Sequence, residues 1–401
     1  MKILFLSDFH LGGGAAIAAT RLAKAFSSAG HEIVRVVGRR ESDDPTIVQE
    51  FARHDSTLDR LRRRVGLLPP TTYRSLPDAT IADINAEKPD WISVHNLHGY
   101  GLRLDFFEKL DAPILWTLHD MWSFTGRCAY NGDCVRYQTN CGHDCPTPTE
   151  YPALAPSLIP QAHAEKTAML RTHPHLHAVT PSNWLRQHAV TSGWPSNRVT
   201  TVRYTLDLDV LKPVSTSAAR VALGIEPSAF VVGFGAMNPG DVRKGGPVLT
   251  AAFDSGLAAE ATLLSIGSRP LPLRRSSDYL HLGTINSDVL LATFYSACDV
   301  FLHLSQQDNL PNMVNESLAC GTPVIATPES GAAEVIEHGV SGLILDRVDQ
   351  HSLSAALAHF QHGAGAHGAW RAAARRRAET VFDAATVVRE YMDLANHLMA
   401  Q

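Results

Sequence analysis

The chain has 401 residues, with 35 basic and 40 acidic side chains and a formal net charge of −5. This length exceeds the size at which one hydrophobic core stops growing, so two domains of about 200 residues each are expected. The balance of charge excludes a global electrostatic footprint for nucleic acid, and no such partner is expected. No segment approaches ~20 consecutive apolar residues, and the N-terminus turns polar at Ser7, too early for a signal peptide. We expect a cytoplasmic protein, or one attached to the inner membrane face only peripherally.

The first half of the chain alternates strand-like and helical segments. A β-type run over residues 2–7 is followed by a glycine-rich turn and a helical pattern over 15–29, which stops at Gly30. Further strand-like runs lie at 31–37, 91–95, 114–118 and 176–180. This alternation predicts a parallel sheet with helices on both faces.

The second half repeats this organisation. Its strand-like runs lie at 230–234, 262–266, 279–282, 300–304, 323–326 and 342–345. A turn-rich link over 202–213 separates the halves, and an amphipathic helix is expected over about 384–399. The predicted fold class is α/β, with two Rossmann-like halves.

Ligands of open α/β sheets bind beyond the carboxyl ends of the strands, so site residues should follow strands directly. Gly12, Gly13 and Gly14 lie between the first strand and its helix, where backbone N–H groups can approach a phosphate or a sugar. The run is not Gly-x-Gly-x-x-Gly, because Ile17 occupies the sixth position, so a nicotinamide cofactor is not favoured. Gly13 and Gly14 are candidates for a ligand contact, and a flexible helix-capping turn is the alternative.

Histidines follow two of the strand-like runs. His119 comes directly after the run 114–118, and His95 and His98 stand with Asn96 at the end of the run 91–95. A histidine among apolar strand residues is more often a satisfied core residue. The pattern alone therefore leaves both a functional and a structural interpretation open.

Arg243 and Lys244 follow the first strand of the second half and precede Gly245 and Gly246. A guanidinium and an ammonium beside a glycine-rich turn can neutralise a diphosphate, which needs about two positive charges if no metal is used. A surface pair that caps a helix is the alternative.

Two carboxylates, Asp308 and Glu316, stand eight residues apart, the first in a loop and the second in a predicted helix. A helix N-terminus can hold an anionic ligand, while the carboxylates accept hydrogen bonds from hydroxyls, which suits sugar binding. The residues at the helix entry are Asn309, Leu310 and Pro311. A solvated loop acid followed by a helix-surface glutamate is the alternative.

Four of the six cysteines lie within eighteen residues, namely Cys128, Cys134, Cys141 and Cys145. Disulfides are disfavoured in the cytoplasm, so four thiolates on a structural Zn²⁺ are the interpretation that we favour. The spacing contains no Cys-x-x-Cys pair, so disulfides and reduced packing thiols remain alternatives. We expect this loop to shape the site and to perform no chemistry.

A dense basic patch covers residues 59–65. Such a patch can contact anionic lipid heads and bring an enzyme to a lipid-linked substrate. A solvated helix face is the alternative interpretation.

The segment from Asp308 to Val324 resembles the acidic donor-sugar motif of the family-4 retaining glycosyltransferases, group 1, which have the GT-B fold. Two acidic residues are separated by seven in that motif, and the first is usually Glu where this chain has the shorter Asp308. The segment 117–120, Thr-Leu-His-Asp, is also similar to one in these enzymes, and the link at 204–207 aligns with their Asn-Gly-(Val/Ile)-Asp. The cysteine loop is similar to loops in relatives that build cell-surface polysaccharides of the colanic-acid type.

The resemblance implies two domains that face one another across a cleft. Residues 1–205, completed by the C-terminal helix 384–401, would form the acceptor side, and 206–383 would bind the nucleotide sugar. Asp308 would hold hydroxyls of the transferred sugar, and Glu316 would hold the ribose. His119 would orient the donor near the reacting centre, with the cluster at His95 and His98 on the acceptor side.

The implied reaction is front-face transfer, in which a phosphate oxygen takes the acceptor proton and no protein nucleophile is needed. Relatives carry Arg where this chain has Ala236, so Arg243 would act with Lys244 on the departing diphosphate. The chain's only Asp-x-Asp, at 207–209, lies in the link, which fits catalysis without a divalent metal. The expected partners are a nucleotide-sugar donor and a glycan or lipid-linked acceptor. The alternatives are a nucleotide-sugar epimerase on the same fold and a non-catalytic nucleotide-sugar-binding scaffold.

Overall fold

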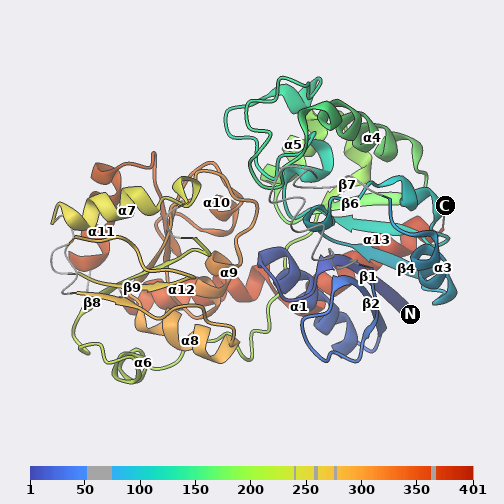
Figure 1. The fold of residues 1–401 in the computed structure, drawn as a ribbon. Coiled ribbons are helices and arrows are strands. Elements are labelled where there is room, and N and C mark those ends of the chain that lie inside the picture. Colours follow the sequence, from blue (N-terminus) through green and yellow to red (C-terminus); the bar gives the residue numbers. More distant parts are fainter. Residues whose placement is uncertain (52–74, 239–240, 257–260, 275–277, 363–366, 401) are drawn as a thin grey trace, which may run out of the picture. The chain divides into compact units, whose positions relative to one another are not determined.

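The computed structural model describes residues 1–51, 75–238, 241–256, 261–274, 278–362 and 367–400. The chain divides into two compact units (Figure 1). Unit 1 comprises Met1–Thr205 and Ala384–Gln401, and unit 2 comprises Leu206–Asp383. Among the described residues, no helix combines the length and apolar character that crossing a bilayer requires.

Unit 1 is built on a parallel sheet of seven described strands in the order β3-β2-β1-β4-β5-β6-β7. The strands are β1 (Lys2–Phe9), β2 (Glu32–Arg39), β3 (Ile47–Glu50), β4 (Trp91–Val94), β5 (Ile114–Thr117), β6 (Leu176–Thr180) and β7 (Val199–Thr201). All five predicted runs form strands, because their apolar side chains are buried on both faces of the sheet. The two edge strands, β3 and β7, were not predicted; each has only three or four residues and is partly polar.

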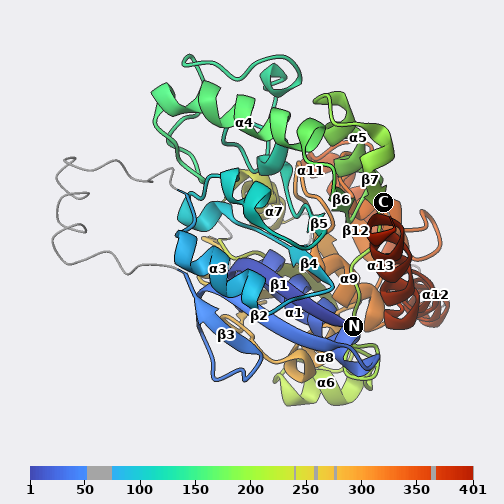
Figure 2. The same cartoon turned by 90° about the vertical axis from the view of Figure 1, so that its right-hand side faces the viewer.

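Helices cover both faces of this sheet (Figure 2). The described α-helices of unit 1 are α1 (Gly14–Ser28), α3 (Asp78–Ala86), α4 (Ile159–Thr172), α5 (Asn183–Thr191) and α13 (Ala384–Met399). The C-terminal α13 packs beside α1 on the sheet, where Val387, Tyr391 and Leu398 share a core with Phe26 and Trp91. Their helical spacing places these apolar residues on one face of α13.

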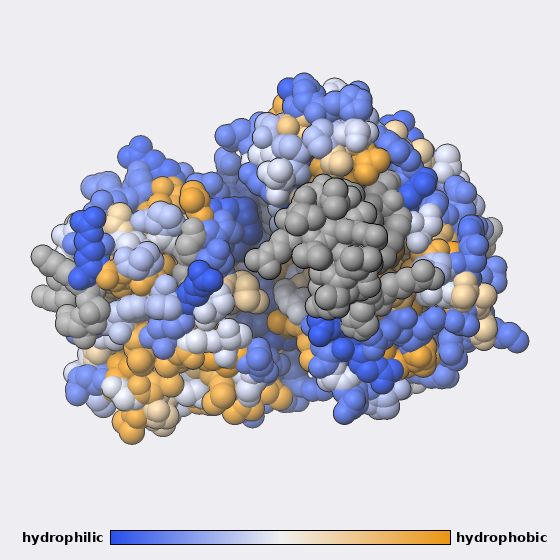
Figure 3. All heavy atoms as spheres, viewed as in Figure 1, coloured by the Kyte–Doolittle hydropathy of each residue, from blue (hydrophilic) through white to orange (hydrophobic). Residues whose placement is uncertain are grey.

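Unit 2 has a parallel sheet of six described strands in the order β10-β9-β8-β11-β12-β13. The strands are β8 (Phe230–Gly235), β9 (Ala261–Ile266), β10 (Tyr279–His281), β11 (Val300–His303), β12 (Val324–Ala326) and β13 (Gly342–Ile344). The described helices are α6 (Thr216–Ala222), α7 (Gly246–Asp254), α8 (Asp288–Ala297), α9 (Asn312–Ala319), α10 (Ala332–Val335), α11 (Gln350–His362) and α12 (His367–Val381). Exposed apolar side chains on α6 and α8 include Val221 and Val289. Figure 3 shows apolar surface over the part of unit 2 where Figure 1 draws these two helices.

The strand orders locate one switch point in each unit. The sequential order reverses between β1 and β4 in unit 1 and between β8 and β11 in unit 2. Open α/β sheets bind ligands beyond the carboxyl ends of the strands at such points. The loops that follow these four strands are therefore the first places to seek functional side chains.

Candidate active site

In unit 2, the loop after β8 packs against the end of β11. Gly245 has φ +77, and a Cβ there would lie 2.4 Å from Cβ of Leu304, so the close approach requires glycine. The backbone N–H of Gln306 donates to the carbonyl of Arg243 over 2.8 Å, and Arg243 Nη1 donates to the carbonyl of Gln307 over 3.0 Å. The structure thereby brings the predicted basic pair to the predicted acidic loop.

Lys244 and Asp308 form an ion pair, with 2.5 Å between Nζ and Oδ2. Asp308 is buried, whereas the Lys244 side chain is one quarter exposed. Burial alone would raise the pKa of Asp308, but the charges of Lys244 and Arg243 and the hydrogen bond from Lys244 hold it well below its usual range. The carboxylate is therefore ionised at neutral pH and already has one cationic partner.

His303 is a site residue that sequence reasoning missed. It is the last residue of β11, and its Nε2 lies 3.8 Å from Oδ2 of Asp308. Burial lowers the pKa of His303 to about 4, so the imidazole is neutral. Its place at the end of an apolar strand, five residues before Asp308, was the only signal in the sequence.

Glu316 lies in α9, which begins directly after Pro311. The side chain is buried, and the hydroxyl of Tyr295 donates to Oε2 of Glu316 over 2.8 Å. Asn309 and Leu310 are also buried. The entry to α9 is thus a packed element that fixes the position of Glu316.

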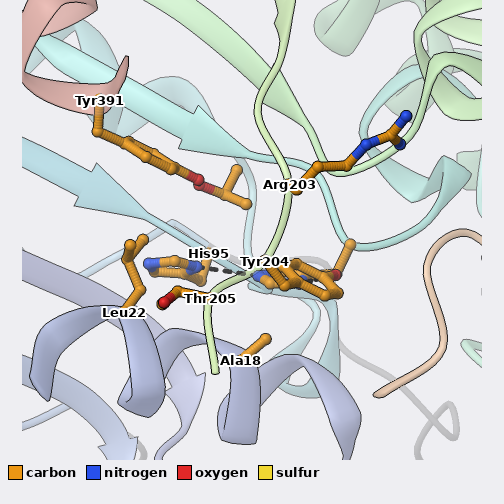
Figure 4. Close-up of a pocket in the computed structure, with 9 residues that line it drawn as sticks. Ala18, Leu22, His95, Arg203, Tyr204, Thr205 and Tyr391 are labelled. Atoms are coloured by element: carbon orange, nitrogen blue, oxygen red, sulfur yellow. Dashed lines mark hydrogen bonds between the residues drawn. The ribbon is translucent and has the colours of Figure 1, made fainter. Parts of the chain in front are cut away.

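In unit 1, His119 takes part in a chain of hydrogen bonds. His119 Nε2 lies 2.9 Å from Nδ1 of His95, and His119 Nδ1 lies 2.6 Å from the hydroxyl of Tyr204. A small pocket surrounds this chain, with Leu22 approaching from α1 and Tyr391 from α13 (Figure 4). Burial lowers the pKa of His119 to about 4, so its imidazole is neutral and can bind a hydroxyl.

Beside this chain, a second cluster unites three strand ends. His98 Nε2 lies 2.8 Å from Oδ2 of Asp120, and the hydroxyl of Tyr151 lies 3.2 Å from His98 Nδ1. Burial opposes protonation of His98, but the carboxylate of Asp120 raises its pKa.

Asp8, at the end of β1, accepts hydrogen bonds from the backbone of Phe9 and Gly99, and burial raises its pKa to about 6. Asp8, Tyr151 and Tyr204 were not predicted, because only the fold brings them to the histidines.

The glycine-rich turn differs in detail from the expectation. Gly13 has φ +89 and directly precedes α1, as a capping glycine does. The backbone N–H groups of His10, Leu11 and Gly12, however, donate to one carboxylate oxygen, Oε2 of Glu41. Successive N–H groups that converge on one anion form a nest, and here a side chain of the protein occupies it. Ligand contacts at Gly13 and Gly14 stay predictions.

The cysteine loop lies next to Lys166, which is fully buried and donates to the carbonyl of Gly126. The pKa of Cys128 is raised to about 11, mainly by burial. The charge of Arg127 opposes this rise, and the thiols of Cys145, Cys141 and Cys134 add to it. All four thiols are free, and the described residues contain no group of three His, Cys, Asp or Glu side chains arranged to hold a metal ion. Zinc binding stays a prediction. The basic patch 59–65 lies outside the described residues.

Fold and site together define a class of protein. Two parallel α/β units with side chains at the strand ends, and a basic pair joined to an acidic loop, are the architecture of the GT-B glycosyltransferases. The family model described as Glycosyltransferase Family 4 matches residues 12–210, and the model Glycosyl transferases group 1 matches residues 229–362. The chain belongs to this family of glycosyltransferases.

Curated relatives agree with this assignment. The chain is 27% identical over 267 residues to the putative colanic acid biosynthesis glycosyl transferase WcaC of Escherichia coli. This match covers 62% of each of the two chains. It is 29% identical over 220 residues to a D-inositol 3-phosphate glycosyltransferase of Thermobispora bispora, covering 47% of this chain and 51% of the relative. The matches thus span less than two thirds of these relatives.

Solved structures share the fold over nearly the whole chain. HepE of Anabaena, in complex with UDP and glucose, has a TM-score of 0.70 at 18% identity and covers 99% of both chains. Sucrose-phosphate synthase from Thermosynechococcus elongatus has a TM-score of 0.72 at 16% identity and covers 100% of both. These likenesses establish the GT-B fold.

Proposed function

We propose that the protein is a retaining glycosyltransferase that moves a hexose from a nucleoside diphosphate to a hydroxyl of a glycan or lipid-linked acceptor. The observation that carries the proposal is the cluster of Arg243, Lys244 and Asp308 at the switch point of unit 2. Glu316, eight residues after Asp308, is buried. Cations beside an ionised carboxylate suit a ligand that has a diphosphate at one end and hydroxyls at the other. Unit 2 would bind the donor, and unit 1 the acceptor.

Each residue has a distinct part in this proposal. Arg243 and Lys244 stabilise the charge that develops on the diphosphate as the glycosidic bond breaks. Asp308 accepts hydrogen bonds from hydroxyls of the transferred sugar, and Glu316 accepts them from the ribose. His119 is neutral, and it can orient the reacting ring if a sugar hydroxyl replaces the Tyr204 hydroxyl as the partner of Nδ1. A phosphate oxygen takes the acceptor proton, so no protein base and no catalytic metal is required.

The relatives support a proposal about the acceptor and the cellular location. WcaC is named for colanic acid biosynthesis, and HepE was solved with UDP and glucose. By analogy, we propose a UDP- or GDP-sugar as donor and an acceptor on a growing cell-surface polysaccharide. A lipid-linked acceptor would bring the cytoplasmic enzyme to the inner membrane face as a peripheral protein.

A thermal-shift screen of UDP- and GDP-sugars, followed by kinetics, tests the proposal. A ligand at 100 times its dissociation constant should add about 2.7 kcal/mol of stability. Arg243→Ala, Lys244→Ala and Glu316→Gln should each lower turnover at least about tenfold, a ~1.4 kcal/mol loss of transition-state stabilisation. Arg347→Ala is the matched control, since Arg347 is exposed and pairs with Asp349. Unchanged turnover in all three site variants would contradict the mechanism.

The same assay separates transfer from its rivals. A transferase releases free nucleoside diphosphate only when an acceptor is present. An epimerase changes the sugar without releasing nucleotide, and a binding scaffold does neither. Retention is tested by the anomeric configuration of the product, which should match that of the donor.

A further inference from the structure

His303 is a buried polar residue at the donor loop. Only 6% of its surface is exposed, and its Nε2 has no hydrogen-bond partner among the residues that the structure describes. Nearly all buried polar atoms are hydrogen-bonded, so such an atom requires an explanation. Oδ2 of Asp308 lies 3.8 Å from Nε2, which is close to hydrogen-bonding distance but beyond it.

The same oxygen of Asp308 is already engaged. Lys244 Nζ lies 2.5 Å from Oδ2, so His303 and Lys244 approach a single carboxylate oxygen. Burial disfavours the imidazolium form of His303; Asp308 favours it, and Lys244 and Arg243 oppose it. While Lys244 holds the carboxylate, His303 therefore stays neutral.

A diphosphate changes this balance. Under the proposed function, Lys244 turns to the phosphate oxygens, which are a stronger attraction for an ammonium group than one carboxylate. Asp308 would then be a buried anion that has lost its closest cation. Asp308 keeps the hydrogen bond from the backbone N–H of Asn309, but weaker compensation of a buried charge is costly, so the site gains if another group becomes positive.

We propose that His303 is the reserve partner of Asp308: when the donor diphosphate draws Lys244 away, His303 takes up one proton from solvent and donates a hydrogen bond through Nε2 to the carboxylate. This inference rests on the proposed donor site. The proton adds to the imidazole, no covalent bond is made or broken elsewhere, and the local charge of the protein rises by one as the anionic ligand enters. Asp308 thereby stays ionised and available to the sugar hydroxyls.

Two consequences are measurable. Donor binding is accompanied by net uptake of up to about one proton at neutral pH. Donor affinity also rises as the pH falls from the pKa that His303 has in the complex toward its lower pKa in the free protein, by up to about tenfold per pH unit.

Calorimetry with UDP-glucose tests this in the full chain, with GDP-mannose as the second probe. The diphosphate diester of either sugar does not titrate near neutral pH, so the proton count reports on the protein. Titrations in two buffers of different ionisation enthalpy give that count directly. We expect clear uptake by the wild type and none by His303→Leu, whose affinity should fall by about tenfold.

His281→Leu is the matched control, because His281 also ends a strand of unit 2 but bonds Ser265. It should leave proton uptake unchanged. Lys244→Met provides a test that does not require a His303 variant to fold. Without Lys244, His303 should be protonated at neutral pH before ligand is added, as the imidazole signals in NMR spectra would show.

The outcomes distinguish the two proposals. If neither nucleotide sugar binds the wild type, the donor site itself is wrong. Binding without proton uptake, or a His303 that stays neutral in Lys244→Met, overturns the role of His303 and leaves the donor site standing.

Discussion

At the scale of single residues, the ion pair of Lys244 and Asp308 should dominate the energetics of the donor site. Asp308 is buried, so removing Lys244 leaves its charge to be compensated by a proton on His303 at a cost, and removing Asp308 leaves Lys244 without its carboxylate partner. Lys244→Met and Asp308→Asn should each destabilise unit 2 by about 2 kcal/mol, after allowance for the exposure of Lys244. The double variant should cost less than the sum. Denaturant unfolding of the four proteins measures the coupling, and strict additivity would contradict it.

Asp8 should make the stability of the folded protein depend on pH. Its pKa is raised by burial to about 6 in the folded protein, above the ordinary value of an unfolded aspartate. The folded state therefore holds a proton that the unfolded state has released, and this contribution to stability is lost as pH rises from about 4 to 6. Relative to the wild type, Asp8→Asn should gain up to about 3 kcal/mol across that window. Melting temperatures of both proteins at several pH values give the difference; a pH-independent difference would count against the assignment.

Much of the site's chemistry could be read from the sequence at this scale. Arg243, Lys244 and Asp308 were selected by their places after strands, and the structure joins them. His303 and Tyr204 could not be selected, because each looks ordinary in its own segment. The imidazole that Tyr204 contacts belongs to His119, far away in the chain, and the carboxylate near His303 gains its importance from Lys244, on another loop.

At the scale of elements, the cysteine loop is the least explained segment. Lys166 of α4 is fully buried beneath it and donates to the carbonyls of Trp122 and Gly126 over 2.8 and 3.3 Å. Burial lowers the pKa of Lys166 to about 7, and the thiols of Cys141 and Cys128 raise it in opposition. An anion in the loop would suit this lysine, and zinc with four thiolates carries roughly two net negative charges.

Metal analysis decides the matter. Protein purified without added zinc should contain about one equivalent, and Cys134→Ser should lose it. Cys298→Ala is the control, because Cys298 is buried in unit 2 and donates to the carbonyl of Phe294. Less than about 0.2 equivalent of zinc per chain in the wild type would contradict the zinc prediction.

Among the strands, the two that were not predicted are short, partly polar edge strands of unit 1, whereas the equally short β10, β12 and β13 were predicted from their sequence runs. Every predicted strand is present, and β3 and β7 are the additions. A central strand can be recognised in the sequence as a run of apolar residues, whereas a partly polar edge strand such as β3 is defined only by the strand that it pairs with. That pairing is set by tertiary structure.

At the scale of the whole molecule, the C-terminal helix α13 completes unit 1. Its residues Val387, Val388, Tyr391 and Leu398 are buried in the core with α1 and the sheet. Removing residues 384–401 should cost at least about 5 kcal/mol, because each buried side chain contributes ~1.5–3 kcal/mol, and unit 1 should unfold.

Circular dichroism and limited proteolysis of the truncated chain measure this effect. Unit 2 forms a separate compact unit and should resist proteolysis. Tyr391→Phe is the mild control, since it removes only the hydrogen bond of 2.9 Å to Thr117 and should cost about 1 kcal/mol. A truncated chain with an unchanged melting temperature would contradict the role of α13.

The sequence alone determined the α/β class, most strands and the donor motif from Asp308 to Glu316, because apolar periodicity and motif spacing are local properties of the chain. Only the tertiary structure decided which side chains meet. Parallel strands place their carboxyl ends along one edge of a sheet, so loops separated by dozens of residues become neighbours there. Asp308 thus gained Lys244, and His119 gained His95 and Tyr204, as partners that no spacing in the sequence reveals.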